Sequence, residues 1–297
     1  MAETMRHAYV AAVRRLRDAG VATPELDARL LLAHSGELSR EDFMAQPDRE
    51  LAPETAARFA AAILRRAGGE PVSRITGMRE FYGREFRLDR HTLDPRPDTE
   101  TLIEAALDFI ARKAWHDAPL RLLDLGTGTG CILLTLLAEL PNACGVGADI
   151  SDGTLAVAKA NARRLGLESR ATFMTGDWFD GMTGTFDLIL TNPPYVASNE
   201  IAGLAREVKD HDPRRALDGG ADGLDSYRRI AAKAAAFLAP GGAVILEIGA
   251  GQADAVRDLF RTGSAGLDEP ALRHDLSGRP RVVLFEGAKV PEQNVAA

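Results

Sequence analysis

The segment Thr191–Val196, Thr-Asn-Pro-Pro-Tyr-Val, follows directly after the apolar run from Phe186 to Leu190. Two adjacent prolines end a central strand, because each lacks the backbone N–H that the ladder needs and each fixes its own φ. The residue before a proline is also biased toward extended geometry. The segment is therefore predicted to be stiff and to lie at the C-terminal end of a strand. It presents an amide, a rigid carbonyl and an aromatic ring, which together could hold a planar NH2 group.

A glycine-rich loop, Asp-Leu-Gly-Thr-Gly-Thr-Gly at 124–130, supplies the second chemical feature. Glycines at 126, 128 and 130 permit a tight turn with positive φ and let a ligand approach the backbone closely. The spacing is not the dinucleotide fingerprint, because the third glycine of that motif would fall on Cys131. No Gly-Lys-Ser/Thr ending of a phosphate loop follows either. The loop is therefore predicted to bind a ligand without recognising a phosphate group.

Acidic residues lie at the end of the second predicted strand and directly after the third. Asp149 lies 19 residues after Gly130, where a carboxylate can accept both hydroxyls of a ribose. S-adenosylmethionine is the common ligand that combines adenosine with the absence of phosphate. Asp177 could accept the adenine amino group, and Trp178 could pack against the ring. Taken singly, such an aspartate is often a cap and such a tryptophan is often core, but their positions at successive strand ends favour one site.

The elements that must position these residues are read from the periodicity after Pro119. Strand, loop and helix patterns alternate, which specifies a doubly wound, mainly parallel α/β sheet. The last two strands are close enough in sequence for an antiparallel hairpin. The predicted strands are 120–125, 143–150, 171–175, 186–191, 243–248, 272–275 and 281–285, and the predicted helices are 132–139, 154–165 and 224–238.

The first part of the chain has a helical pattern from Thr4 to about Ala67, which predicts a small bundle. Gly68 and Gly69 close it, and the alternation around Gly83 predicts a hairpin between the bundle and the sheet. The apolar positions that recur at helical spacing are Tyr9, Val13, Leu16, Leu26, Leu30, Ala33, Phe59, Ile63 and Leu64.

Composition bounds the class of protein. The chain has 297 residues, of which 45% are apolar and 27% charged, so a globular protein of two domains is expected. No apolar run approaches the span of a bilayer, and the first residues mix charge into their apolar positions, so we expect a cytoplasmic protein. Cys131 and Cys144 have neither disulfide-framework nor zinc-ligand spacing. We therefore expect reduced thiols and no metal.

The net charge of −7 is unevenly distributed along the chain. Residues 1–85 carry 13 basic and 13 acidic side chains, so the whole excess of acid lies in the remainder. Affinity for nucleic acid that comes from phosphate neutralisation requires a basic face. The sequence therefore argues against a nucleic-acid-binding sheet domain.

Taken together, the motifs closely resemble those of the release factor glutamine methyltransferases, also called the HemK or PrmC family. The residues that carry the resemblance are Asp124–Gly130, Asp149, Asp177–Phe179, Asn192–Tyr195, Gly-Met-Arg-Glu-Phe-Tyr-Gly at 77–83 and Pro-Arg-Pro-Asp-Thr-Glu at 95–100. The last of these segments is the most discriminating, because Asn-Pro-Pro-Tyr is shared with enzymes that methylate adenine amino groups. Asp94 departs from the aliphatic residue that the family often has before that segment.

The resemblance implies a Rossmann-like class I S-adenosylmethionine-dependent methyltransferase sheet with an N-terminal helical bundle and a hairpin linker. The expected domains are 1–70, a bundle that docks the substrate; 71–95, the linker; 96–290, the methyltransferase domain; and 291–297, a flexible tail. The residues implied to bind S-adenosyl-L-methionine are Gly126, Thr127, Gly128, Thr129, Gly130, Asp149, Asp177, Trp178 and Asn192. Those implied in catalysis are Asn192, Pro193 and Tyr195, and Pro194 joins them in binding the substrate.

The implied reaction methylates the glutamine amide in the Gly-Gly-Gln motif of class I peptide chain release factors, giving N5-methylglutamine and S-adenosyl-L-homocysteine. An amide nitrogen is a poor nucleophile because its lone pair is delocalised. If Asn192 and the Pro193 carbonyl accept its two hydrogens, the nitrogen is aimed at the sulfonium methyl and its developing positive charge is stabilised. Tyr195 can pack on the flat amide. No strong base is needed.

Two alternatives remain at this stage. An N6-adenine methyltransferase acting on DNA or RNA would use the same Asn-Pro-Pro-Tyr chemistry on a flipped base, but would be expected to carry a basic recognition region. A ligand-binding module without catalysis would not need Asn192, Pro193 and Tyr195 beside a complete glycine loop. We expect a monomer whose partner is the release factor, with no direct nucleic-acid or membrane partner.

Overall fold

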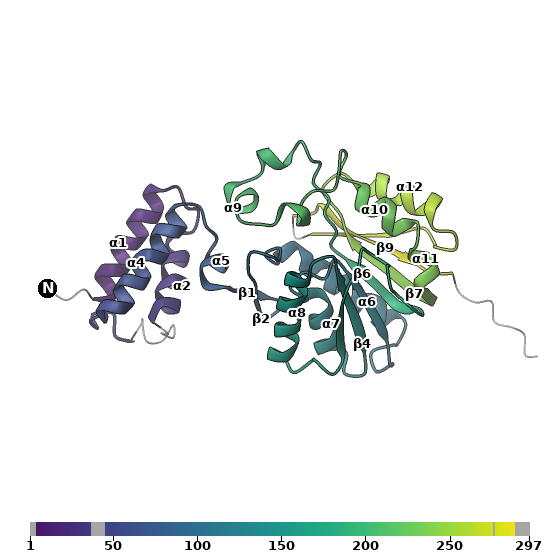
Figure 1. The fold of residues 1–297 in the computed structure, drawn as a ribbon, viewed down its shortest axis with the longest axis horizontal. Coiled ribbons are helices and arrows are strands. Elements are labelled where there is room, and N and C mark those ends of the chain that lie inside the picture. The colour runs from purple at the N-terminus through teal and green to yellow at the C-terminus, as the bar shows by residue number, and fades with distance from the viewer. Residues whose placement is uncertain (1–3, 37–44, 276, 289–297) are drawn as a thin grey trace, which may run out of the picture. The chain divides into compact units, whose positions relative to one another are not determined.

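The computed structural model describes residues 4–36, 45–275 and 277–288 (Figure 1). The tail expected at 291–297 lies outside the described residues. Contacts divide the chain into two units, Met1–Met78 with Ala205–His211, and Arg79–Leu204 with Asp212–Ala297. We refer to them as the helical unit and the sheet unit. Among the described residues, no helix is both long enough and apolar enough to cross a membrane.

The helices between residues 5 and 76 share one apolar core. Thr4 caps the first helix by accepting a hydrogen bond from the backbone N–H of His7. Arg66 is buried and pairs with Asp27 (2.6 Å) and Glu207 (2.7 Å), which joins three helices of the unit. The helices are α1 (Met5–Asp18), α2 (Pro24–Gly36), α4 (Pro53–Ala67), α5 (Val72–Thr76) and the short α9 (Arg206–Lys209).

The apolar residues of α2 are not all buried. Leu26 and Leu30 recur at helical spacing, but their exposed fractions are 43% and 44%. The core takes Ala28, Leu31 and Leu32. Because α2 carries apolar residues on more than one side, their spacing alone does not decide which face is buried. Packing against α1 and α4 makes the choice.

A two-stranded hairpin begins the sheet unit, as predicted around Gly83. It consists of β1 (Met78–Phe81) and β2 (Arg84–Arg87). Tyr82 and Gly83 in the turn both have positive φ, 51° and 72°. Two such residues in a two-residue connection suit the right-handed twist of paired strands.

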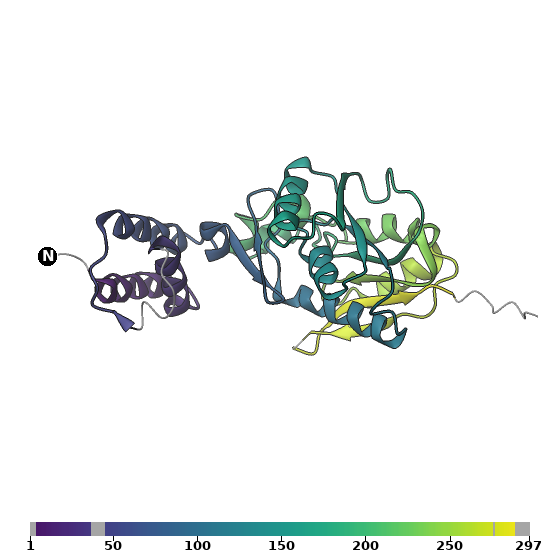
Figure 2. The ribbon, with the colours of Figure 1, turned by 90° about the horizontal axis from the view of Figure 1, so that it is seen from below.

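The main sheet has seven strands in the order β5-β4-β3-β6-β7-β9-β8. Figure 1 labels β4, β6, β7 and β9 of this sheet, and Figure 2 shows the same ribbon from below. The first five strands in this order are parallel to one another, and β9 and β8 pair antiparallel. This confirms the predicted doubly wound sheet and its terminal hairpin. The strands are β3 (Arg121–Leu125), β4 (Cys144–Asp149), β5 (Ala171–Thr175), β6 (Phe186–Thr191), β7 (Leu238–Glu247), β8 (Ala271–His274) and β9 (Pro280–Glu286).

Alternate residues of the central strands enter two different cores, because successive side chains of a strand point to opposite faces. Leu122 lies in the core that contains the helices α6 (Glu100–Arg112) and α7 (Cys131–Glu139). Leu123 lies in the core that contains α10 (Asp225–Ala231) and α12 (Ala253–Gly263). Both faces are covered, which explains why these strands read as continuous apolar runs.

The sheet unit departs from the sequence prediction after residue 224. The single helix expected over 224–238 is two short helices, α10 and α11 (Ala234–Phe237). Lys233 leaves the helical region at φ −125°, and Leu238 already pairs with Phe186 in the sheet. Strand β7 therefore starts earlier than expected. The helix propensity of the alanine-rich stretch is overridden by this tertiary pairing.

Candidate active site

A cavity of about 430 Å³ lies where the loops leave the C-terminal ends of the parallel strands. Open α/β sheets bind their ligands at this edge. The cavity brings together many of the residues singled out in the sequence, and it adds others from 91–93 and 215–229. Its walls include Gly126, Gly128, Asp149, Ile150, Asp177, Trp178, Asn192, Pro194, Arg215 and Arg229.

The glycine loop joins β3 to α7 and reaches the cavity through its backbone. Gly126, Gly128 and Gly130 all have positive φ, at 70°, 57° and 81°. Thr127 and Thr129, which are expected from the sequence to bind the cofactor, have buried side chains and are not in the cavity wall. They support the loop from its buried side through hydrogen bonds. The Thr127 hydroxyl donates to Asp124 at 2.6 Å, and the Thr129 carbonyl accepts from Asn161 at 2.9 Å.

Asp124 is a residue of this loop that the sequence prediction did not include in the site. It is fully buried, and burial raises its pKa to about 7. Among the described residues its Oδ1 atom has no hydrogen-bond partner. Asp124 is not in the cavity wall, and its hydrogen bond with Thr127 supports the loop from its buried side.

Asp149 ends β4 at the cavity wall, where the sequence predicted it. Its Oδ2 atom accepts from the Gly128 N–H at 3.2 Å, and its Oδ1 atom accepts from the Ser151 N–H at 3.0 Å. These bonds hold the carboxylate against the glycine loop. Burial raises the pKa of Asp149, and hydrogen bonds to the backbone counter that effect. Beside it, Ile150 is 62% exposed and offers an apolar surface to the cavity.

Asp177 and Trp178 also line the cavity. The Asp177 carboxylate forms an ion pair with Arg229 on α10, so it already has a partner in addition to any ligand. Trp178 has a φ of 59°, an unfavourable region for a bulky side chain that costs about 1–3 kcal/mol. Backbone strain of this kind persists only where the surrounding structure holds the residue in place. Here the strained residue lines the cavity.

The Asn-Pro-Pro-Tyr segment follows β6 and is tied to two other segments. The Asn192 Nδ2 atom donates to the Thr99 hydroxyl at 3.0 Å. The Thr99 hydroxyl donates to Glu247 at 2.6 Å, and the Tyr195 hydroxyl donates to the same carboxylate at 3.4 Å. Asn192 and Pro194 lie in the cavity wall, whereas Pro193 is buried behind it. The sequence prediction missed Glu247, although it is a lone charge in an apolar strand.

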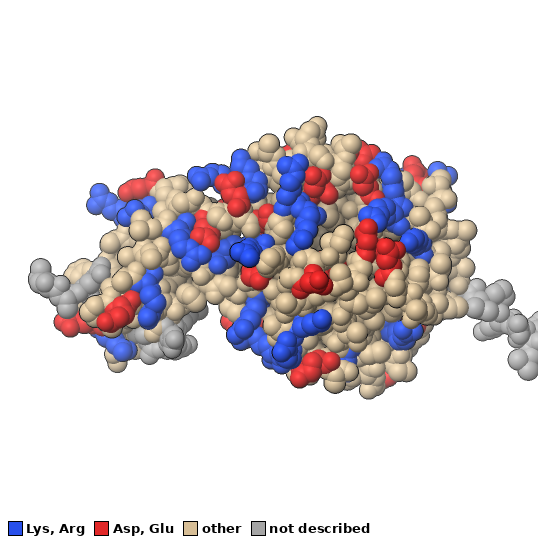
Figure 3. Space-filling model, in the orientation of Figure 1, with Lys and Arg blue, Asp and Glu red and all other residues tan. Residues whose placement is uncertain are grey.

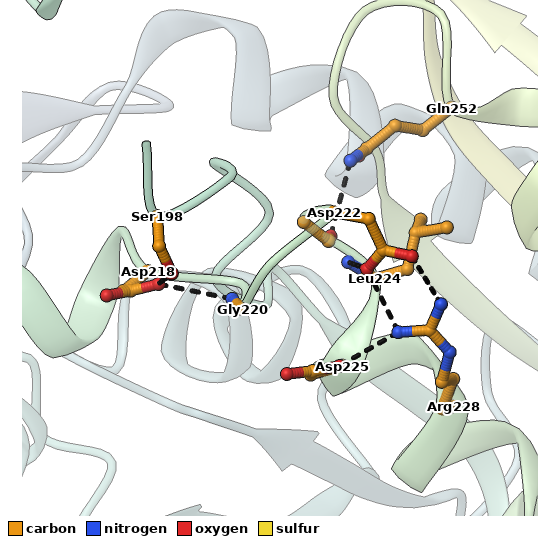
Figure 4. A network of polar contacts seen from close by, with 9 residues as sticks. Ser198, Asp218, Gly220, Asp222, Leu224, Asp225, Arg228 and Gln252 are labelled. Carbon is orange, nitrogen blue, oxygen red and sulfur yellow. Dashed lines mark hydrogen bonds and ion pairs between the residues drawn. The ribbon is translucent and has the colours of Figure 1, made fainter. Parts of the chain in front are cut away.

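The chain after Tyr195 is held by a further set of hydrogen bonds (Figure 4). Gln252 donates to the carbonyls of Tyr195 (3.0 Å) and Gly223 (3.2 Å). Asp218 accepts from Ser198 and from the Gly220 N–H. A Cβ added at Gly223 would lie 2.4 Å from the Tyr195 carbonyl oxygen, so only glycine permits this approach. The backbone beside Tyr195 is thus fixed from both sides.

The Pro-Arg-Pro-Asp-Thr-Glu segment places Thr99 at the end of the short helix η1 (Pro97–Thr99). Arg96 forms an ion pair with the buried Asp212. Asp94, which directly precedes this segment, is buried and pairs with Arg79 at 3.7 Å. The carboxylate is therefore accommodated by a neighbouring cation and leaves the Thr99 contacts in place.

Comparison of the sequence with known proteins identifies the family to which the chain belongs. Two family models match the chain, "PrmC N-terminal domain" over residues 7–77 and "Methyltransferase small domain" over residues 106–221. A release factor glutamine methyltransferase of Rhodospirillum rubrum is 51% identical over 91% of this chain and 81% of its own length. That of Caulobacter vibrioides is 42% identical over the full length of both chains. The chain belongs to the release factor glutamine methyltransferase family.

Membership of this family makes the protein a methyltransferase, and the cofactor is S-adenosylmethionine. The cavity fits this molecule on observations of its own. It has a glycine loop open to close approach, a carboxylate at the end of β4 and an apolar surface from Ile150 and Trp178. Asp149 would hold the ribose hydroxyls.

Proposed function

We propose that this protein methylates the side-chain amide of the glutamine in the Gly-Gly-Gln motif of class I peptide chain release factors, giving N5-methylglutamine. The observation that carries the proposal is the position of Asn192 in the cavity wall with its NH2 group already bound to Thr99. Its Oδ1 oxygen is thereby left as an acceptor for the NH2 group of a substrate amide. The curated relatives, named release factor glutamine methyltransferases, support the same reaction.

The residues act by positioning and by charge stabilisation. Asn192 Oδ1 and the Pro193 carbonyl accept the two amide hydrogens, which orients the nitrogen and stabilises positive charge as it develops. Tyr195 packs on the planar amide, and its hydroxyl bond to Glu247 fixes the ring. When bound, S-adenosyl-L-methionine supplies an electrophilic methyl group and becomes S-adenosyl-L-homocysteine. The amide nitrogen forms a bond to the methyl carbon as the bond between that carbon and sulfur breaks. The methylated nitrogen is then positively charged and strongly acidic, so it gives one proton to water and no strong base is required.

The rival substrate, the amino group of adenine in DNA or RNA, is less well supported. The excess of acidic residues lies in the part of the sequence that forms the sheet unit. Figure 3 shows basic and acidic side chains interspersed over the face in view. A nucleic-acid site that relies on phosphate neutralisation would need a basic stripe. We therefore propose that the protein binds the release factor without direct nucleic-acid contacts. As expected from the sequence, we also propose a monomer that works in the cytoplasm.

The substrate assignment is tested by incubating the purified protein with S-adenosylmethionine and a class I release factor, followed by peptide mass spectrometry. We expect the Gly-Gly-Gln peptide to gain one methyl group on the glutamine side chain. A release factor with alanine in place of that glutamine should gain none. Methylation of adenine in a parallel DNA or RNA reaction, with an unmodified release factor, would contradict the proposal.

We further propose that the helical unit docks the release factor. Leu26 and Leu30 lie one turn apart on α2 and are 43% and 44% exposed, so they form an apolar surface on that helix. Contiguous apolar surface marks protein contact sites when the patch is large, and these two leucines are the exposed apolar pair on α2 from which such a patch would be built. The near-neutral charge of residues 1–85 suits a protein partner better than a polyanion.

Replacing both leucines by serine is expected to raise KM for intact release factor about tenfold, because roughly 1–2 kcal/mol of apolar contact is lost. The value of kcat and the affinity for S-adenosylmethionine should stay unchanged. Steady-state methylation kinetics measure this. The matched control is Leu272→Ser, which removes an apolar side chain that is 41% exposed on the sheet unit. Equal KM values for the double variant and the control would contradict docking through α2.

A further inference from the structure

Glu247 is a buried carboxylate at the end of the apolar strand β7. It is 1% exposed, and two hydroxyl groups donate to its carboxylate while a third donates to its backbone carbonyl. Thr99 donates to Oε2 at 2.6 Å, Tyr195 donates to Oε1 at 3.4 Å, and Tyr227 donates to the backbone carbonyl at 3.1 Å. The methyl-transfer chemistry does not require a carboxylate here. The role of Glu247 therefore lies in the hydrogen bonds that it imposes on neighbouring side chains.

The direction of the hydrogen bonds follows from the ionised state of Glu247. A carboxylate only accepts, so the single hydrogen of the Thr99 hydroxyl is committed to it. The Thr99 oxygen can then only accept from Asn192. The NH2 end of the Asn192 side chain must therefore face Thr99, as observed at 3.0 Å. The opposite, flipped amide would set the Asn192 oxygen against the Thr99 oxygen with no hydrogen between them.

The charged groups around Glu247 come from several elements. Arg281 on β9 is buried and bonds to Asp98 of η1 at 3.0 Å and to Asp275 at 3.3 Å. Burial raises the pKa of Glu247 to about 7, Arg281 opposes that rise, and Asp98 adds to it. Tyr195 and Tyr227 both have a raised pKa because they are buried, so they remain neutral donors. The carboxylate therefore ionises near neutral pH.

We propose that Thr99 and Glu247 are positioning residues that fix the orientation of the Asn192 side-chain amide and thereby make the site select an amide over a carboxylate. This inference rests on the proposed function. An Asn192 oxygen that faces the substrate accepts N–H groups from glutamine. It repels the carboxylate of glutamate, whose oxygens are acceptors only. A flipped Asn192 would present its NH2 group and lose that discrimination.

Three variants separate positioning from mere structural support. Glu247→Gln keeps the shape but can donate as well as accept, so Thr99 is free to reverse its hydrogen bond. Thr99→Val removes the hydroxyl with little change in volume, whereas Thr99→Ser restores it. Thr135→Val is the control, since Thr135 is a buried threonine on α7 whose hydroxyl has no partner among the described residues. Thermal unfolding and S-adenosylmethionine binding show whether each variant is folded.

We expect Thr99→Val and Glu247→Gln to lower kcat on release factor about 10- to 100-fold, the size of effect that orienting partners of ligand residues have in metal enzymes. Thr99→Ser and Thr135→Val should stay close to the unchanged protein. A release factor with glutamate in place of the Gly-Gly-Gln glutamine should inhibit the unchanged protein weakly. It should inhibit Glu247→Gln and Thr99→Val more strongly.

The pH dependence of kcat is a further test, because a purely structural role of Glu247 would not produce it. A carboxyl group with a raised pKa is protonated below about pH 7 and can then donate to Thr99, which releases the constraint on Asn192. At saturating cofactor and release factor, kcat of the unchanged protein should rise as the pH increases through about 7. In Glu247→Gln this rise should be absent.

Unchanged kcat, inhibition and pH dependence in folded Glu247→Gln and Thr99→Val would overturn the inference. So would a loss of activity in Thr99→Ser as large as in Thr99→Val. These outcomes differ from failure of the proposed function, in which the unchanged protein itself would leave the release factor glutamine unmethylated.

Discussion

Replacing Asn192 by alanine should lower kcat for release factor methylation about 100- to 1,000-fold, the usual effect of removing one preorganised group that stabilises the transition state. Asn192 is the cavity-wall residue whose oxygen is left to accept from a substrate amide. Alanine removes that acceptor and leaves the Pro193 carbonyl to orient the nitrogen alone. The affinity for S-adenosylmethionine should fall much less, because the glycine loop and Asp149 remain.

Single-turnover methylation and calorimetric titration with S-adenosylmethionine measure the two effects separately. Asn142→Ala is the matched control, because Asn142 is an exposed asparagine whose Nδ2 atom bonds to the Asp117 carbonyl at 2.9 Å, just before β4. It should retain full activity. Retention of most activity by folded Asn192→Ala would show that the Asn192 oxygen does not hold the substrate amide.

The second large effect is expected at Gly128. Gly128→Val should abolish measurable S-adenosylmethionine binding, because a branched side chain would occupy the cavity wall where the ligand approaches the backbone. The φ of 57° adds strain of about 1–2 kcal/mol for a residue with a Cβ. No heavy atom lies closer than 3.9 Å to the added Cβ, so the protein itself has room for it. The loss should therefore fall on the ligand.

Gly166→Val separates backbone strain from occlusion. Gly166 has a φ of 69°, and a Cβ there meets nothing within 4 Å. Both variants should lose similar free energy of unfolding, measured by denaturant titration, while only Gly128→Val loses cofactor binding in calorimetry. Equal cofactor affinities in the two variants would show that the glycine loop is not part of the cofactor site.

Local sequence patterns are sufficient to predict the structural features that depend only on the local backbone. The two prolines after β6 stop the strand because of their own covalent structure, and the glycines of the loop adopt positive φ because they lack a Cβ. The parallel strands are predicted closely because burial on both faces leaves a continuous apolar run. Together these features are enough to place the glycine loop, Asp149 and Asn192 at one edge of the sheet.

Tertiary structure decided the contacts between segments that are distant in the chain. Thr99 and Glu247 are 148 residues apart, yet they share the hydrogen that orients Asn192. Neither residue lies in a local sequence pattern that predicts its hydrogen bond with the other. The choice of the buried face of α2 and the division of residues 224–238 between helix and strand were likewise made by packing. Spacing along the chain reports the local backbone, whereas the partner of a buried polar group depends on which strands and turns the fold places beside it.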